Sequence, residues 1–266
     1  MQSQIRIMAG FLFHDVIFGP VRSRRLGLSL GVNLLPAHSK YCSFNCIYCE
    51  CGWTPEVLSE KPEFPSRELV SQYLEQRLLE LIRENYLPQA ITFAGNGEPT
   101  LHPEFPGIVT DTLALRDRYA PETEVAVLSN GSMVHDPQVF NALILLDANI
   151  QKLDAGFEKL FLLINNPVFP IRFAELTANL KKFSGQVIIQ SMFLRGHHNG
   201  QWIDNTLEED VQAWLQQIKE INPELVMIYP VSRATPGGTL EKIPIFELEK
   251  IALRVNKFGI ETKVYH

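Results

Sequence analysis

The chain has 266 residues, of which 45% are hydrophobic and 20% are charged, and its formal net charge is −6. This composition is ordinary for one globular domain, and its acidic balance disfavours strong non-specific binding to nucleic acid. No apolar run approaches the roughly 20 residues of a membrane span, and the first residues lack the apolar stretch of a secretory signal. We therefore expect a cytoplasmic protein.

Apolar runs alternate with amphipathic segments along the chain, a pattern that predicts strands followed by helices. In chain order, strands are expected at residues 28–36, 90–95, 125–131, 149–156, 187–193 and 225–231. Helices are expected between and after them, at residues 66–82, 104–118, 136 onward, 171–183, 206–218 and 246–257. The C-terminal segment, 245–266, is expected to end in a closing strand over 260–266.

Local capping signals predict where three of these helices begin. Ser66 can cap the first helix, Asp136 precedes a proline at the first helical position, and Thr206 with Glu209 forms a capping-box pattern. The first helix has apolar positions that fit the 3.6-residue period, namely Val70, Leu74, Leu78, Leu81 and Ile82.

Strands that are almost continuously apolar are typical of a parallel sheet with both faces covered. Six strand–helix units predict an α/β fold, a partial (β/α)6 TIM-like barrel, because a full barrel has eight units. With no linker or repeat in the sequence, we expect one domain over residues 1–266. In such folds the active site lies at the C-terminal ends of the strands.

All four cysteines lie in one ten-residue loop, 42–51, directly after the first strand: Cys42, Cys46, Cys49 and Cys51. Such density indicates a metal or cluster loop rather than disulfides. The C-x3-C-x2-C spacing of the first three suits a [4Fe–4S] cube with one iron left open. Cys51 is a possible fourth ligand, and a structural zinc or iron–sulfur module without catalysis is the alternative from another class.

A second motif, Gly95-Asn96-Gly97-Glu98, follows the second strand. The glycines allow the backbone to approach a ligand, and Glu98 offers a carboxylate to an ammonium group. Alone, such a loop is more often a tight turn. Further polar residues stand at or in the following strands, where turn chemistry or helix capping is the simpler explanation for several: Ser129, Asn130, Lys152, Asp154 and Gln190.

Basic residues near the expected site are candidates for anion binding. Arg22, Arg24 and Arg25 precede the cysteines; a solvated cluster is the ordinary interpretation, and an anion or substrate contact is the rival one. Arg195 and Arg233 follow the fifth and sixth strands, and we predict that they contact an anionic substrate.

The C-x3-C-x-Tyr48-Cys49 loop, together with Glu98 one unit later, resembles the signature of radical S-adenosylmethionine (SAM) enzymes. The resemblance implies that Cys42, Cys46 and Cys49 hold a [4Fe–4S] cluster whose open iron is chelated by SAM. An electron from the cluster then cleaves SAM to methionine and a 5′-deoxyadenosyl radical, which abstracts hydrogen from a substrate. It therefore implies an iron–sulfur oxidoreductase.

The same resemblance implies which residues bind SAM. Tyr48 matches the aromatic position beside the adenine, Glu98 matches the family's Gly-Gly-Glu carboxylate, and Lys152 can meet the methionine carboxylate. The implied SAM site comprises Tyr48, Gly95, Asn96, Gly97, Glu98, Ser129, Asn130, Lys152, Asp154 and Gln190.

Stretches such as "GNGEPTLHPEF" and "PVSRATP" are similar to a compact subgroup related to the tRNA wyosine-synthesis enzymes. No cysteine precedes Cys42, so we do not expect the second cluster of wyosine chemistry. The substrate stays open: an RNA or a partner protein, modified as in tRNA modification or activated as by a glycyl-radical activase. A reductant protein such as flavodoxin or ferredoxin is the implied electron donor.

Overall fold

The computed structural model describes residues 11–55, 62–232 and 239–266. Its strands are β1 (Ile17–Ser23), β2 (Gly27–Val32), β3 (Ala90–Phe93), β4 (Glu124–Ser129), β5 (Ala148–Lys152), β6 (Ile188–His198), β7 (Gln201–Asp204), β8 (Leu225–Pro230), β9 (Thr239–Lys242) and β10 (Glu261–Val264). Its helices are α1 (Arg67–Arg83), α2 (Phe105–Tyr119), α3 (Pro137–Leu143), α4 (Glu158–Asn165), α5 (Phe173–Lys181), α6 (Glu208–Ile221) and α7 (Ile245–Asn256), with a 3-10 turn η1 (Pro99–Leu101).

The strands form one sheet in the order β1-β2-β3-β4-β5-β6-β8-β10. The six expected strands, β2 to β6 and β8, pair in parallel, and β10 adds a further parallel strand beside β8. Among the described residues β1 and β10 do not pair with each other, so the barrel is partial, as predicted. The C-terminal strand therefore extends the sheet without closing it.

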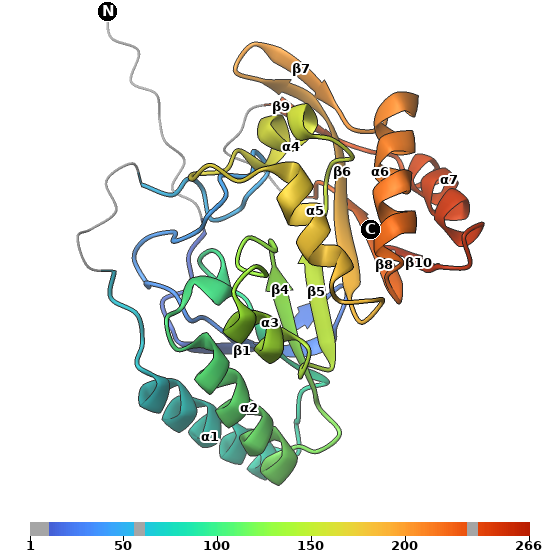
Figure 1. Cartoon of the computed structure of the whole chain (residues 1–266). Helices are drawn as coiled ribbons and strands as arrows, with labels where there is room; N and C mark the ends of the chain where they lie inside the picture. The colour runs from blue at the N-terminus through green and yellow to red at the C-terminus, as the bar shows by residue number, and fades with distance from the viewer. Residues whose placement is uncertain (1–10, 56–61, 233–238) are drawn as a thin grey trace, which may run out of the picture.

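Helices that follow one another in sequence surround the sheet (Figure 1). In this view α3 and α5 lie in front of β4 and β5, and α6 and α7 lie along the side of β8 and β10. Neighbouring helices pack on one another, with α1 against α2 and α2 against α3. This is the arrangement expected when each strand returns through a helix to the next parallel strand.

Alternation along the strands gives the sheet two buried faces. On the outer face, Val32, Phe93 and Val127 join the large core under the helices. On the inner face, which is directed toward the barrel interior, a smaller cluster includes Ala126, Ile150, Ile188 and Met227. Because side chains alternate with a period of two, Lys152, Gln190 and Tyr229 fall on this inner face as well. The alternation of side chains along β5, β6 and β8 thus directs one polar residue of each strand into the barrel.

Two of the predicted helix starts are confirmed and one is wrong. Ser66 accepts a hydrogen bond from an N–H of the first turn of α1, and Asp136 does the same for α3. The capping box at Thr206 does not form, because its hydroxyl donates to Asp204 (2.6 Å) and α6 begins after Leu207. Of the predicted apolar face of α1, Ile82 is exposed rather than buried.

Besides the 3-10 turn η1, four elements were not predicted from sequence: β1, α4, β7 and β9. The strand β6 continues to His198, five residues past its predicted end, because β7 and β9 pair antiparallel with its extension. The helix α4 has eight residues and no side-chain cap, so the capping signals used above do not mark it. β1 and β7 form hairpins with β2 and β6, and β9 pairs with β6 from further along the chain, so pairing with another strand specifies these three strands.

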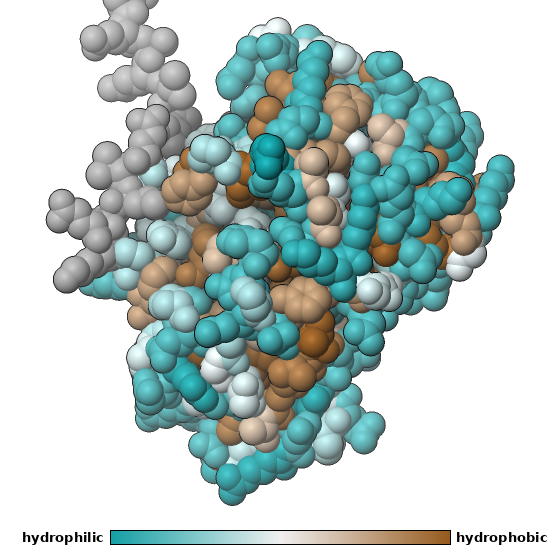
Figure 2. Space-filling model, viewed as in Figure 1, coloured by the Kyte–Doolittle hydropathy of each residue, from teal (hydrophilic) through white to brown (hydrophobic). Residues whose placement is uncertain are grey.

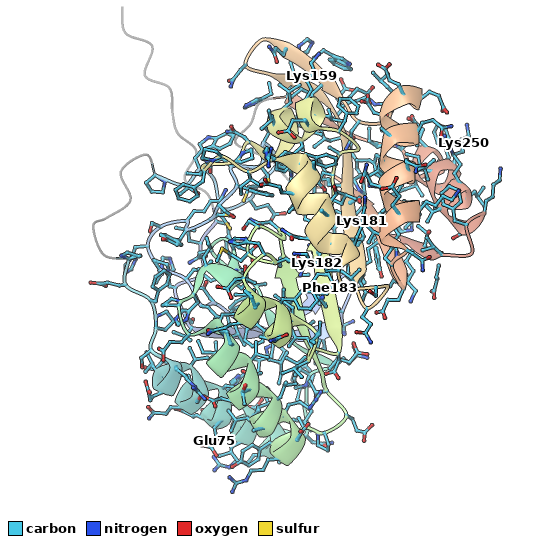
Figure 3. The ribbon with its side chains drawn as sticks, in the orientation of Figure 1. Glu75, Lys159, Lys181, Lys182, Phe183 and Lys250 are labelled. Carbon is cyan, nitrogen blue, oxygen red and sulfur yellow. The ribbon has the colours of Figure 1, made fainter. Side chains whose placement is uncertain are left out.

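No helix in the described parts of the chain is both long and apolar enough to cross a membrane. The face seen in Figure 2 is largely hydrophilic, with hydrophobic patches set among polar residues. Charged side chains such as Glu75 on α1 and Lys250 on α7 lie at the outside of the helical layer (Figure 3).

Candidate functional site

The cysteine loop is held between two other loops at the C-terminal edge of the sheet. On one side, Tyr41 forms a parallel bridge with Gly97, and the Tyr41 N–H donates to the Asn96 carbonyl (2.8 Å). On the other side, the Asn45 N–H donates to the carbonyl of Asn166 (2.9 Å), just beyond the end of α4. These bonds fix both flanks of the loop without using any thiol.

The glycines of the Gly-Asn-Gly-Glu loop are required by protein packing. A Cβ at Gly97 would lie 1.9 Å from the Tyr41 carbonyl oxygen, and one at Gly95 would lie 2.3 Å from Oδ1 of Asn33. Both glycines also have positive φ, +143° at Gly95 and +146° at Gly97, which other residues rarely adopt. The loop can therefore pack directly on the cysteine loop only with glycine at these positions.

Asn96 is held by hydrogen bonds within the protein, and its predicted place in the SAM site stays a prediction. Its side chain is fully buried and donates to the carbonyls of Phe13 (2.8 Å) and Pro36 (2.9 Å), while its Oδ1 accepts from the Phe13 N–H. It therefore ties the segment before β1 and the end of β2 to this loop, and it is not among the residues lining the pocket described next.

The four cysteines line one pocket of about 200 Å³, here called the cysteine pocket. It lies where β2, β3, β4 and β5 end, the edge predicted for the active site. Eight predicted SAM-site residues share this pocket: Tyr48, Gly95, Gly97, Glu98, Ser129, Asn130, Lys152 and Gln190. A larger pocket of about 540 Å³ lies at the other end of the strands, lined by residues 25–27, 87–89 and 120–124, and contains no cysteine.

The thiols have contrasting environments. Burial raises the pKa of Cys42 to about 12 and also raises the pKa of Cys46. A hydrogen bond from the Cys51 thiol lowers the pKa of Cys49 to about 5. Amide groups approach two of the sulfurs, with Asn130 Nδ2 3.6 Å from Cys42. These donors can stabilise thiolate ligands, whose charge burial otherwise disfavours.

Lys40, which we did not predict from the sequence, lies beside these thiols. It is 3% exposed, and its Nζ donates to the Gly52 carbonyl (3.0 Å) at the far end of the cysteine loop. Burial alone would lower the pKa of Lys40, but the charges of Cys49 and the neighbouring thiolates outweigh it and the pKa is raised. Lys40 therefore supplies a positive charge next to the ligand set. Its only sequence signal is its place two residues before Cys42.

The donor set fits a [4Fe–4S] cluster. Cys42, Cys46 and Cys49 face one pocket with amide donors and a lysine around them, and thiolates are the ligands that hold such clusters. Over residues 11–55, 62–232 and 239–266, no group of three or more His, Cys, Asp or Glu side chains is placed to hold a single metal ion.

Glu98 lines the pocket, and its carboxylate accepts hydrogen bonds from its own loop and from the loop after β4. It is 2% exposed and accepts from the Thr100 hydroxyl (2.5 Å) and the Asn130 N–H (2.6 Å). Burial raises its pKa, an effect that these hydrogen bonds oppose. Oε1 also accepts from the Thr100 N–H (3.1 Å), so both of its acceptor sites are used, and an ammonium group would have to donate to Oε2.

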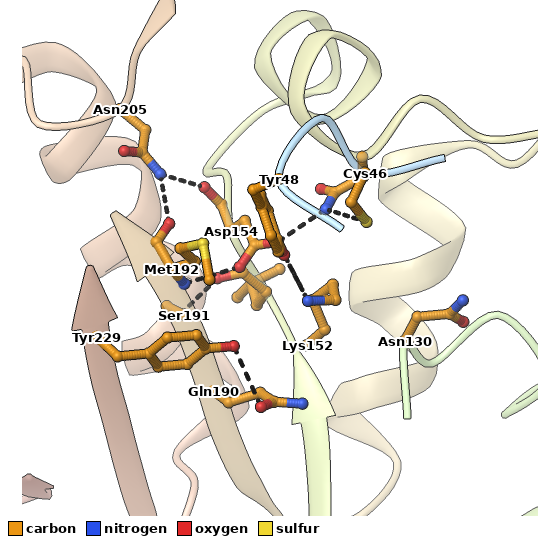
Figure 4. Close-up of polar contacts among 12 residues, drawn as sticks. Cys46, Tyr48, Asn130, Lys152, Asp154, Gln190, Ser191, Met192, Asn205 and Tyr229 are labelled. Carbon is orange, nitrogen blue, oxygen red and sulfur yellow. Dashed lines mark hydrogen bonds and ion pairs between the residues drawn. The ribbon is translucent and has the colours of Figure 1, made fainter. Parts of the chain in front are cut away.

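Asp154 organises the opposite wall (Figure 4). Its Oδ2 accepts from the Tyr48 hydroxyl and from Asn165 Nδ2 (2.7 Å), and lies 3.6 Å from Lys152 Nζ; its Oδ1 accepts from the Met192 N–H (2.9 Å). Burial and the Asp154 charge raise the pKa of Tyr48, so its hydroxyl stays a donor. Asp154 does not line the pocket. It orients Tyr48 and Lys152, which do.

Gln190 meets a residue from the opposite end of the sheet. Its Oε1 accepts from Arg25, in the turn between β1 and β2, and from the Tyr229 hydroxyl (3.2 Å). Of the basic cluster, only Arg25 enters the pocket, whereas Arg22 and Arg24 are exposed.

Of the two predicted substrate contacts, Arg195 does not line the cysteine pocket. Arg195 lies in the extension of β6, where it forms an ion pair with Glu247 and donates to the Thr206 hydroxyl (3.1 Å). It is therefore engaged elsewhere, and its contact with substrate stays a prediction without support from the geometry. Arg233 lies outside the described residues.

Comparisons with known proteins agree with this site. Residues 37–155 match the family model described as "Radical SAM superfamily", a span that includes the cysteine loop, Glu98 and Asp154. A GTPase Obg of Brachyspira hyodysenteriae is 29% identical over 88% of the chain and 32% of its own length. A UPF0026 protein of Methanocaldococcus jannaschii is 32% identical over 78% of the chain and 61% of its own length. The chain thus spans about a third of the length of the first relative and about three fifths of the length of the second.

Solved structures share the fold at low sequence identity. A radical SAM methyltransferase from Sphaerobacter thermophilus has a TM-score of 0.61 at 13% identity, covering 89% of this chain and 65% of that one. TYW1 with a lysine-pyruvate adduct bound has a TM-score of 0.60 at 14% identity, covering 86% and 73%. Streptococcus suis SuiB bound to S-adenosylmethionine also scores 0.60 at 14% identity, covering 89% and 50%.

Proposed function

We propose that this chain, whose residues 37–155 match the radical SAM superfamily model, is an enzyme that binds a [4Fe–4S] cluster and SAM and produces a 5′-deoxyadenosyl radical to abstract hydrogen from a substrate. The observation that carries the proposal is the single pocket shared by Cys42, Cys46, Cys49 and Glu98 at the strand ends. The proposal treats residues 1–266 as one radical SAM domain in a reducing, cytoplasmic compartment, with flavodoxin or ferredoxin as electron donor.

Each residue of the pocket has a defined task in this proposal. The thiolates of Cys42, Cys46 and Cys49 hold the cluster, which when bound supplies the electron that cleaves SAM. Glu98 accepts hydrogen bonds from the SAM ammonium group, and Lys152 offers its charge to the SAM carboxylate. Lys152 is 15% exposed at the side chain and is kept charged by Asp154, so it can bind an anion without a change of protonation.

The wall of the pocket supports the adenosine half of SAM. Tyr48 is 8% exposed and its hydroxyl is fixed by Asp154, which holds the ring still for stacking against adenine. Ser129 and Asn130 offer polar groups from the end of β4, and Gln190 does so from β6. Gly95 and Gly97 contribute backbone at a place where no side chain fits. A buried pocket of this kind also limits the access of water to a reactive radical.

The test is reductive cleavage of SAM. The protein is reconstituted with iron and sulfide without oxygen and incubated with SAM and dithionite, and 5′-deoxyadenosine is quantified by mass spectrometry. We expect product from the wild type and none from Cys46→Ala. Cys51→Ala is the matched control and is expected to keep a full complement of cluster iron. Absence of product from a fully reconstituted wild type would reject the proposal and favour a structural iron–sulfur module.

The class of substrate is tested separately. A tRNA-modifying enzyme should form a salt-sensitive complex with tRNA, because phosphate contacts release counterions. A glycyl-radical activase should leave a glycyl radical on its partner protein, detectable by electron paramagnetic resonance.

A further inference from the structure

Arg25 reaches the cysteine pocket from the end of the sheet where the strands begin. It lies in the turn of the β1–β2 hairpin, and its guanidinium carbon is 4.8 Å from the centre of the Tyr229 ring. One of its nitrogens, Nη1, donates to Oε1 of Gln190, on the inner face of β6. The cation therefore lies inside the partial barrel, among groups contributed by β6 and β8.

The other cations of the pocket have negatively charged partners within the protein. Lys152 lies 3.6 Å from Asp154, and Lys40 lies among the cysteine thiols. Arg25 forms no ion pair with any residue in the described parts of the chain, and its partners Gln190 and Tyr229 are uncharged. A half-buried charge without a counter-charge is unfavourable unless an anion completes the site.

The geometry leaves Arg25 able to bind such an anion. A guanidinium has five N–H donors in a planar fork, and one is used by Gln190. Because the guanidinium lies over the Tyr229 ring, its plane is fixed, and the N–H donors at its edge stay available to a ligand. Two parallel N–H groups match the spacing of the oxygens in a carboxylate or a phosphate.

We infer that the substrate presents an anionic group, a carboxylate or a phosphate, to Arg25 inside the barrel. This inference rests on the proposed function, since it takes the cysteine pocket as the site where SAM and substrate meet. Glu98 and Lys152 provide for the charged ends of SAM, so Arg25 is available to a second ligand.

The test measures anion binding by reconstituted protein saturated with SAM. Inorganic phosphate is titrated and followed by ³¹P line broadening, and acetate is titrated and followed by saturation transfer to its methyl signal. Arg25→Gln is expected to weaken binding of the preferred anion about tenfold or more, the usual effect of removing a charged hydrogen-bond donor. Preference for phosphate or for acetate identifies which group the substrate carries.

Arg24→Gln is the matched control, since it removes the same charge from the same hairpin. Arg24 is exposed and donates to the carbonyl of His266 (2.6 Å), outside the pocket, so binding should change by no more than about twofold. Arg25→Lys keeps the charge without the planar fork and should bind more weakly than the wild type but more tightly than Arg25→Gln.

Two results would overturn the inference: no saturable binding by the SAM-saturated wild type, or equal losses in the Arg24 and Arg25 variants. The outcome is separable from that of the proposed function. Normal SAM cleavage with anion binding unaffected by Arg25→Gln refutes the inference alone. Absence of SAM cleavage with anion binding that depends on Arg25 refutes the proposed function and retains an anion site.

Discussion

Replacing one oxygen of Asp154 should destabilise the whole wall of the pocket that carries Tyr48 and Lys152. In Asp154→Asn, Oδ1 can still accept from the Met192 N–H, but an NH₂ group replaces the oxygen that accepts from Tyr48 and Asn165. The Tyr48 hydroxyl can turn and accept instead. The amide of Asn165 is a donor only and loses this acceptor. The ammonium of Lys152 keeps its hydrogen bond to the Tyr48 hydroxyl (2.5 Å) but loses the carboxylate charge that lies 3.6 Å away.

The size of the effect follows from burial. The Asp154 side chain is 0% exposed and that of Lys152 is 15% exposed, so the substitution leaves a largely buried ammonium without its counter-charge. Removing one partner of a buried ion pair costs about 3–5 kcal/mol. With an unfolding entropy of about 2.1 cal/mol/K per residue, a chain of this length should lose about 5–9 °C in Tm.

The assay is thermal unfolding of the metal-free, reduced protein, followed by far-ultraviolet circular dichroism. Asp117→Asn is the matched control because Asp117 is 69% exposed at the side chain, and within the described parts of the chain its ion pair is with its neighbour Arg116 at the surface. Its Tm should change by about 1 °C or less. If Asp154→Asn melts within about 1 °C of the wild type, Asp154 does not hold this wall together, and the assignment of its orienting role fails.

Two further predictions concern the loop after β3. Gly97→Ala should lower the free energy of unfolding by more than about 3 kcal/mol in urea denaturation, because the added Cβ would lie 1.9 Å from the Tyr41 carbonyl oxygen. The control is Gly200→Ala, which is also at positive φ but has nothing within 4 Å of the added Cβ. It should lower the free energy of unfolding by only about 1–2 kcal/mol. His102 is buried, its pKa is lowered by burial, and its Nδ1 accepts from the Glu104 N–H. Protonation is therefore easier in the unfolded state, so this residue's contribution to stability is complete above about pH 6.5 and falls as pH drops toward the lowered folded pKa. The difference in Tm between wild type and His102→Gln should shrink between pH 7.5 and 5.5, and a difference that stays constant or grows would contradict the assignment.

Much of the fold was predictable because its signals are local. The six parallel strands are apolar runs, and the helix starts at Ser66 and Asp136 depend on hydrogen bonds within one turn. The capping box at Thr206 failed for the opposite reason. A neighbouring carboxylate, Asp204, took its hydroxyl, a competition that the spacing of Thr206 and Glu209 does not reveal.

The candidate site likewise has a part that local sequence predicts and a part that depends on contacts between distant residues. The spacing of Cys42, Cys46 and Cys49 and the Gly-x-Gly-Glu98 sequence predict a common site, since both follow strands of one parallel sheet. The structure brings them into one pocket. Sequence did not predict that Asn96 would face the segment before β1, because its partners lie 60 and 83 residues away.

The sequence by itself determined the chemistry-bearing loop, the order of the strands and the edge at which the site lies, because spacing and periodicity are properties of neighbouring residues. Only the tertiary structure decided which side chains surround that loop. Arg25 meets Gln190 across 165 residues, and Tyr48 meets Asp154 across 106. Such contacts depend both on which face of the sheet a side chain lies on and on which strands are neighbours. They therefore form only when the whole sheet has folded.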